Sequence, residues 1–184
     1  MAEPFTGDST GTTTPEMVLG WFSHGTLPGV QTLAFLQERT ASGFDIQFAG
    51  TNLETILFPR LLSIDENNVS GGAAVFTING NDALESVYVP WLTTSYAPLV
   101  ITNNGSLTRV DLPVWEPIDG QVVTFSTNAL SAFTVNQVLA DCVANGSYAT
   151  GAVHLEGGLN SPPTGQGILD SGTLTGRGVS VFHN

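Results

Sequence analysis

The sequence predicts an all-β protein: a single jelly-roll sandwich or barrel of about eight to nine strands with one or two short helices. Short segments such as GFDIQFAG at 43–50 alternate apolar and polar residues, which is the period of a half-buried strand. Turn residues recur about every 8–12 positions, a spacing typical of sandwiches and barrels. No strand–helix–strand rhythm and no internal repeat is evident, so a parallel α/β sheet is not expected.

The first third of the chain is expected to hold a flexible arm, a short helix and the first strands. Residues 1–13 are small and polar, and we predict them to be a flexible N-terminal arm before a single jelly-roll domain at 14–184. Thr14 followed by Pro15 predicts a short helix to about residue 22. Strands are predicted at 30–38, 43–50, 54–64 and 73–80. Pro59 marks the third of these as an edge strand, a bulge or two short strands.

The middle of the chain continues this strand series. A strand is predicted at 84–92, followed at 97–115 by two strands that Asn104-Gly105 would join as a hairpin. In the second of these strands, one face is expected to hold Thr108, Val110, Leu112 and Val114. The other face is expected to hold Leu107, Arg109 and Asp111, and the Arg109/Asp111 pair indicates that it is solvated.

The period changes after the strand predicted at 121–126. Thr134 and Gln137 form a capping-box pattern, and apolar residues then follow at helical spacing, which predicts an amphipathic helix at about 135–144. A strand at 147–156, a Gly/Pro-rich loop at 157–167 and a final strand at 172–183 complete the expected fold.

The charge balance excludes several classes of partner. The chain has 16 acidic residues, 4 arginines and no lysine, for a formal net charge of -12. Nucleic-acid binding needs a basic patch, and attraction to an anionic lipid surface needs the same, so neither is expected. The self-repulsion of such a chain is strong in dilute buffer and mostly screened in molar salt.

Cys142 is the single cysteine, so no internal disulfide is possible. It lies on the apolar side of the predicted helix, where it is either a small buried apolar residue or a possible interchain disulfide partner. No segment is long and apolar enough to span a membrane, and the first ten residues lack the pattern of a signal peptide. Synthesis in a host cytoplasm is therefore expected.

The histidines offer one weak candidate for a metal site. His154 and Glu156 are two residues apart on a predicted strand and so share a face, where they could supply two ligands to a metal ion. No third ligand lies near them in the sequence. His24 and His183 stand alone in the sequence. A polar face near a strand end explains the pair more simply, and we predict no metal.

The sequence offers no catalytic constellation. Carboxylates are paired at Asp65-Glu66 and at Glu116 with Asp119, but glycoside hydrolysis depends on their separation in space. No Gly-x-Ser-x-Gly motif is present, and a phosphate-binding loop of the Walker type needs a lysine. We therefore predict no catalytic residues, no cofactor and no enzyme activity.

Aromatic residues leave two interpretations open. Trp91, Trp115, Tyr88 and Tyr96, together with Trp21, would suit a sugar-stacking platform. Aromatic residues in strands more often belong to the core, and we expect Trp91 and Trp115 to be packing residues near the rim of the barrel.

The whole chain resembles the small major capsid proteins of icosahedral, internal-membrane viruses that infect halophilic archaea. The resemblance rests on length, on the lysine-free acidic composition and on strand segments such as GFDIQFAG, VYVPWL, LVITNNGSLTRVDLPVW and GVSVFHN. It implies a single upright jelly roll that pairs with itself and with a second, larger capsid protein in a shell over an internal membrane, without a membrane span of its own. It also implies that Cys142 is the candidate for a link between capsid proteins.

The leading hypothesis from the sequence is therefore a structural capsid protein located in the virion. The alternative is a viral spike or fibre component or a carbohydrate-binding β-sandwich module, for which the tryptophan and tyrosine residues argue. A glycoside hydrolase, suggested by the scattered carboxylates, is the third hypothesis.

Overall fold

The computed structural model describes residues 53–64, 76–96 and 98–184, and before them the backbone of four short strands. Its strands form three sheets. The first sheet contains, in spatial order, β1 (Phe5–Thr6), β2 (Thr32–Ala34), β5 (Thr55–Leu57), β8 (Ser86–Tyr88) and β11 (Arg109–Asp111). The second contains β12 (Glu116–Pro117), β9 (Thr94–Ser95), β6 (Ser63–Ile64) and β3 (Thr40–Ala41). The third contains β15 (Ser180–Phe182), β14 (Ala152–His154), β13 (Val122–Thr124), β10 (Leu99–Thr102), β7 (Phe76–Asn79) and β4 (Phe44–Ile46).

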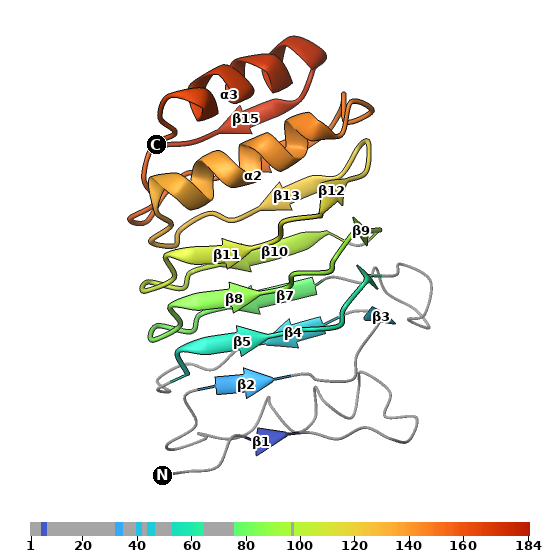
Figure 1. Ribbon diagram of the computed structural model, residues 1–184. Coiled ribbons are helices and arrows are strands. Elements are labelled where there is room, and N and C mark those ends of the chain that lie inside the picture. Colours follow the sequence, from blue (N-terminus) through green and yellow to red (C-terminus); the bar gives the residue numbers. More distant parts are fainter. Residues whose placement is uncertain are drawn as a thin grey trace.

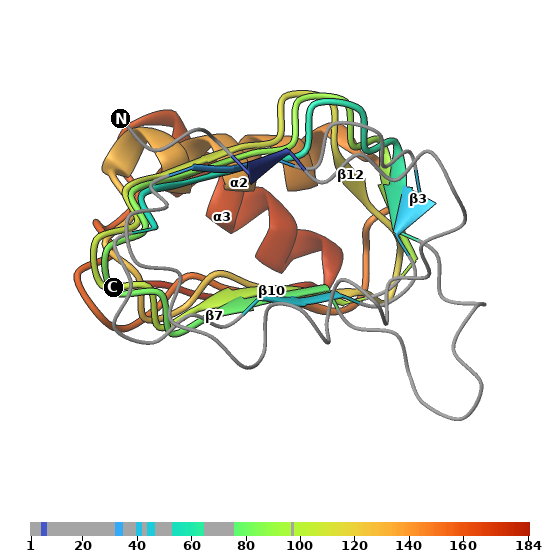
Figure 2. The ribbon, with the colours of Figure 1, turned by 90° about the horizontal axis from the view of Figure 1, so that it is seen from below.

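The chain passes through the three sheets in turn and so winds into stacked coils (Figure 1). One coil is β5, β6 and β7, the next is β8, β9 and β10, and the third is β11, β12 and β13. Each strand pairs in parallel with its equivalent in the next coil, as Ile56 does with Val87 and Val87 with Val110. The architecture is a three-sided parallel β-solenoid, seen along its axis in Figure 2.

The prediction of a strand-rich fold with few helices is confirmed, but the jelly-roll topology is not what the structure has. A jelly roll is built from antiparallel strands, whereas every strand pair here is parallel. The predicted hairpin at Asn104-Gly105 is also wrong, because β10 and β11 lie in different sheets. An Asn-Gly pair marks a turn, but it does not decide whether the next strand folds back or continues onto a new face of the coil.

The expectation of no internal repeat is wrong as well. Once the coils are aligned, the sequence repeats as LETILFP at 53–59, LESVYVP at 84–90 and LTRVDLP at 107–113. The first, fourth and sixth residues of each segment are buried, and the third and fifth belong to the outer face. Three copies of unequal spacing, with different residues at most positions, leave too little identity for simple inspection to detect.

The core lies inside the coils and is built from columns of apolar side chains that run along the solenoid axis. One column contains Ile56, Val87 and Val110, each at most 5% exposed. Leu112 is buried too, while Arg109 and Asp111 lie on the outer face, so the predicted alternation is confirmed for residues 109–112. It is wrong at both ends of the predicted strand, because Leu107 is buried while Thr108 and Val114, in the turns, are exposed. Because each coil covers the apolar side chains of its neighbour, the stack buries what no coil buries alone.

A column of buried asparagines holds one corner of the coils together. Asn104 Oδ1 accepts hydrogen bonds from the backbone N–H and the side-chain amide of Asn81, both at 3.0 Å. Asn128 Oδ1 accepts from the same two groups of Asn104, at 3.0 and 3.1 Å. The Asn128 amide in turn donates to the carbonyls of Ile101 and Phe125. All three asparagines are at most 1% exposed, so each buried amide is matched by partners in the next coil.

Helix α2 (Ala132–Ala144) follows the third coil and lies beside β11, where the next strand of the first sheet would stand (Figure 1). The helix predicted at 135–144 is confirmed, but it begins earlier, at a cap provided by Ser131 and not by Thr134. The Thr134 N–H donates to Ser131 Oγ at 3.2 Å, and Thr134 Oγ1 donates to the Thr108 carbonyl at 2.9 Å. The helix therefore covers the edge of the first sheet.

The strand predicted at 172–183 is mostly wrong. Residues Gln166–Arg177 form helix α3, and only Ser180–Phe182 is a strand, β15. Glycine and threonine disfavour helix in isolation, so the local sequence argues against α3. Packing against α2 supplies the missing stability, and Gly178, with a φ of 108°, ends the helix in the left-handed conformation. Figure 2 shows α3 crossing the end of the solenoid between the two long layers.

Several predictions lie wholly or partly outside the described residues. The helix predicted at about 15–22 falls there, and so does the arm at 1–13 except for the two residues of β1. Strands β2 and β4 lie within the strands predicted at 30–38 and 43–50. Neither of the helices in the described part of the chain is long and apolar enough to cross a membrane.

Candidate functional site

A repeated turn projects one residue per coil into solvent at the corner that follows the first sheet. The turns are Phe58–Leu61, Val89–Leu92 and Leu112–Trp115, and in each the last N–H donates to the first carbonyl, at 3.4, 3.2 and 3.1 Å. Proline occupies the second position of all three turns, where its fixed φ suits a β-turn. The third residue of each turn therefore points outward, and the fourth returns to the core.

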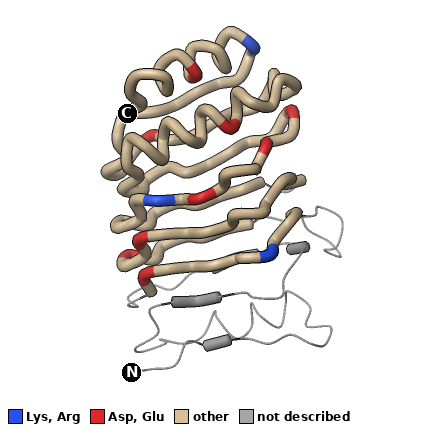
Figure 3. The backbone as a smooth tube through the Cα atoms, in the orientation of Figure 1, with Lys and Arg blue, Asp and Glu red and all other residues tan. Residues whose placement is uncertain are grey.

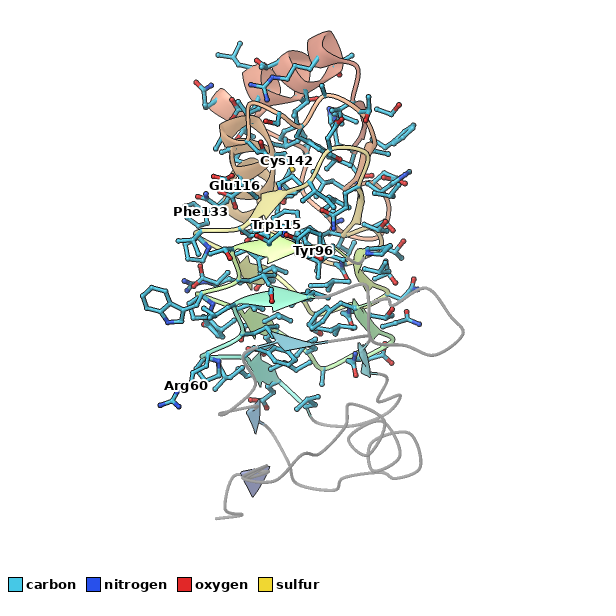
Figure 4. The ribbon with its side chains drawn as sticks, turned by 90° about the vertical axis from the view of Figure 1, so that its right-hand side faces the viewer. Arg60, Tyr96, Trp115, Glu116, Phe133 and Cys142 are labelled. Carbon is cyan, nitrogen blue, oxygen red and sulfur yellow. The ribbon has the colours of Figure 1, made fainter. Side chains whose placement is uncertain are left out.

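The third positions form an exposed column of Arg60, Trp91 and Val114, which we call the proline-turn column. Trp91 is 58% exposed and Val114 is 43% exposed. Figure 4 shows Arg60 projecting away from the body of the solenoid. By contrast, Trp115 occupies the fourth position of its turn and is only 1% exposed.

Trp91 and Arg60 share a hollow in the surface. Its lining is Pro59, Arg60, Leu62 and Trp91, which come from two consecutive coils. An indole ring beside aliphatic side chains and a guanidinium group gives this hollow an apolar wall and a hydrogen-bond donor. Such a combination is typical of binding sites that hold an amphipathic ligand.

The outer face of the first sheet carries a further cation, at the start of β11 and outside the lining of the hollow. The guanidinium carbon of Arg109 lies 5.3 Å from the centre of the Tyr88 ring, and Arg109 Nη2 lies 3.0 Å from Asp111 Oδ2. Stacking on one side and an ion pair on the other hold Arg109 in place. Figure 3 shows that basic positions are few and far apart on the described coils, where acidic positions are more frequent.

The structure separates the aromatic residues that the sequence grouped together. Trp115 is a core residue, as predicted, whereas the prediction that Trp91 packs in the core is wrong. Tyr96 is 51% exposed but follows a strand of the second sheet, and Trp21 lies outside the described residues. The proline before each exposed residue was the signal that would have distinguished Trp91 from Trp115.

The predicted pair of His154 and Glu156 is in contact on the outer face of the third sheet. His154 Nδ1 lies 2.9 Å from Glu156 Oε1, and the imidazole stacks on Phe182 with ring centres 4.6 Å apart and planes at 9°. Within the described ranges, no group of three or more His, Cys, Asp or Glu side chains is placed to hold a metal ion. His183 is exposed near the end of the chain, and His24 lies outside the described residues.

The carboxylates flagged by the sequence have separate surroundings. Asp119 Oδ1 accepts hydrogen bonds from the Ala149 N–H at 3.0 Å, the Thr150 N–H at 2.7 Å and Thr150 Oγ1 at 2.9 Å. These donors lower the pKa of Asp119, so this carboxylate joins two turns as a stable anion. Glu116 is exposed on β12, and Asp65 and Glu66 lie outside the described residues.

Helix α2 carries two buried titratable groups side by side. Cys142 is fully buried, and burial raises the pKa of its thiol, so the thiol is unreactive where it stands. The interchain disulfide stays a prediction, and it would require Cys142 to become accessible. Burial also raises the pKa of Asp141 to about 6, opposed by a 2.8 Å hydrogen bond from Gln137 Nε2 and assisted by the negative charge of Asp111.

Comparisons with protein-family models, with curated proteins and with solved structures found no match. The function of the chain must therefore be argued from its own side chains. Among the described residues, the proline-turn column and its hollow are the surface feature that the fold itself does not require.

Proposed function

We propose that this chain is a carbohydrate-binding β-solenoid and that it binds glycans through the hollow beside Trp91. The observation that carries the proposal is the exposed indole of Trp91 next to Arg60 in a hollow built from two coils. One face of a sugar ring is a row of C–H groups that stacks on an aromatic ring, while its hydroxyl groups need hydrogen-bond partners.

The solenoid geometry supports binding of a chain of sugars. Equivalent positions of successive coils are spaced by about 4.8 Å, which is comparable to the length of one pyranose unit. Arg60, Trp91 and Val114 stand at three such positions, so an extended glycan lying along the solenoid axis would meet one of them in each coil. A repeated architecture with an aligned column of exposed side chains is suited to a repeated ligand.

The guanidinium group in the hollow favours a sugar that carries a carboxylate. Arg60 is the charged residue that lines the hollow. A guanidinium group binds a carboxylate with two parallel hydrogen bonds, which a neutral sugar cannot provide. The proposal is for binding without turnover, as the sequence analysis expected.

The test is a glycan array followed by calorimetry with Trp91→Ala and Arg60→Gln. We expect saturable binding that Trp91→Ala reduces at least about tenfold, because truncating a tryptophan at the centre of a binding site commonly costs about 2 kcal/mol or more. Arg60→Gln is expected to weaken carboxylate-bearing glycans more than neutral ones. Val122→Ala is the control, since Val122 is an exposed apolar residue on β13 of the third sheet, outside the proline-turn column, and its loss should leave affinity within about twofold.

Two results would contradict the glycan proposal. The first is the absence of saturable binding to any glycan by the folded chain. The second is glycan binding to which Trp91→Ala makes no difference, since the site would then lie elsewhere. If the chain released reducing sugar from a glycan, its activity would be hydrolysis and not binding alone.

The capsid role expected from the resemblance stays a second candidate, and the solenoid changes the form that it would take. Shell contacts would form between the faces and ends of stacked coils and not between the flanks of a jelly roll. The uncharged end of the molecule formed by α3 is the observation that favours self-association. Electron microscopy of particles carrying a labelled chain tests this role, and a chain absent from every shell would refute it.

A further inference from the structure

Helix α3 presents an apolar face to solvent at the end of the solenoid. Ile168 and Leu169 are 58% and 63% exposed, and the inward face of the helix is formed by Gly167, Asp170 and Leu174. Figure 1 shows α3 as the last layer of the stack, so the described part of the chain places no further layer on it. Ile168 and Leu169 are adjacent, so on this terminal helix they form one small exposed apolar patch.

Two glycines on the same helix have no explanation inside the chain. A Cβ at Gly167 would collide with the Asn136 side chain, so close packing against α2 accounts for that glycine. A Cβ at Gly172 or Gly176 would meet nothing within 4 Å. A glycine in a helix costs about 1 kcal/mol relative to alanine, and a spacing of four residues places Gly172 and Gly176 on one face. A second backbone that approaches this face closely would account for both.

The exposed part of α3 also carries no charge. Asp170 is 6% exposed and accepts a hydrogen bond from Gln166, and Arg177 points toward the end of α2, where it donates to the carbonyls of Val143 and Asn145. A chain with a net charge of -12 repels its own copies, so identical copies can meet only where the surface is free of acidic groups. The face of α3 satisfies that condition.

We propose that this face is the contact between two copies of the chain, with the α3 helices of the copies packed against each other around a two-fold axis. A two-fold contact places the same surface on both sides, so an uncharged apolar face is complementary to itself. Gly172 stands near the middle of the helix and would lie close to the axis, where the two backbones approach most closely. One helix per copy is a small interface, so the dimer is expected to be weak, with a dissociation constant of about 1 μM or higher.

Analytical ultracentrifugation and an introduced cysteine test the contact. Raising the salt concentration from about 0.05 M to about 1 M should tighten the dimer, because salt screens the repulsion between two acidic chains. Leu169→Glu should weaken it at least about tenfold, since it places two like charges across the axis. Under mild oxidation, Gly172→Cys should give a disulfide-linked dimer, because the native Cys142 is buried.

Matched variants on the third sheet provide the control. Val122 is 43% exposed on β13, away from α3, so Val122→Glu should leave the dimer unchanged and Val122→Cys should not cross-link. Gly172→Ala combined with Gly176→Ala should raise the Tm of the monomer and weaken the dimer together. A strict monomer at high salt and high concentration would overturn the proposal. So would a dimer that is indifferent to every α3 substitution, whatever the outcome of the glycan experiment.

Discussion

Two corners of the coils differ in which side chains they bury: one buries polar side chains, and the other exposes apolar ones. At one corner, Asn81, Asn104 and Asn128 bury polar side chains and match each amide with partners in the next coil. At the other corner, the proline turns expose Trp91 and Val114, which are apolar, while the residue after each returns to the core.

This contrast distinguishes residues that stabilise the fold from exposed residues that contribute little to its stability. A buried amide with a full set of hydrogen bonds stabilises one register of the coils, because any slip would leave the amides unpaired. An exposed tryptophan gains little from folding, so its presence at a proline turn points to a ligand. The following predictions, from the largest expected effect to the smallest, test this separation.

The largest effect on stability is expected from Trp115→Ala, with Trp91→Ala as its control. Trp115→Ala removes a side chain that is 1% exposed and packs against Phe125, with ring centres 6.4 Å apart. It should lower the free energy of unfolding by about 3–5 kcal/mol, whereas Trp91→Ala should change it by less than about 0.5 kcal/mol. Urea unfolding followed by circular dichroism measures both. Equal losses would show that Trp91 is a packing residue after all.

A somewhat smaller effect is expected from the asparagine column. Asn104→Ala removes the acceptor for two Asn81 donors and leaves the carbonyls of Ile78 and Thr102 without the Asn104 amide. The free energy of unfolding should fall by about 3 kcal/mol, measured in the same way.

The neighbouring Asn103 supplies the control for that experiment. Asn103 is exposed and has a φ of 56°, a conformation that glycine adopts freely. Asn103→Gly should therefore cost less than about 1 kcal/mol. A similar loss at both positions would mean that the column contributes no more than an ordinary surface turn.

The smallest effect on stability is expected at Asp141, whose burial disfavours the charged carboxylate. The pKa of Asp141 is raised to about 6 by burial, so the folded state favours the protonated acid. Its contribution to stability is therefore present below about pH 4 and is lost as the pH rises to about 6. Asp141→Asn should remove this pH dependence and raise the free energy of unfolding at pH 7 by about 2 kcal/mol.

Asp119 gives a control of opposite sign for the pH experiment. Backbone and hydroxyl donors lower the pKa of Asp119, so its contribution to stability is present at neutral pH and is lost on acidification. Asp119→Asn should consequently lower stability at pH 7. Thermal unfolding from about pH 2 to pH 7 distinguishes the two variants, because the contribution of Asp119 is lost only below the ordinary pKa of a carboxyl group. A change of the same sign in both variants at pH 7 would contradict the assignment.

Much of the local structure was predictable from the sequence. The alternation of Val87, Val89, Val110 and Leu112 with polar neighbours correctly placed those residues inside, and the helical spacing after residue 134 correctly predicted α2. Those patterns depend only on which side chains avoid water along one segment. Helix α3 was not predictable in this way, because its glycines and threonines oppose helix and only packing on α2 overcomes them.

The sequence by itself determined which residues face the core where a strand alternates regularly, as at Val110 and Leu112, where the chain turns, and that the molecule is acidic and without lysine. Only the tertiary structure decided that each turn leads onward to a new face and so to parallel pairing, which brought Arg60 beside Trp91 and aligned the asparagines of separate coils. The physical reason is that alternation and turn preference are local properties of the chain. The choice between antiparallel and parallel neighbours depends on which segments distant in the sequence bury one another's surfaces.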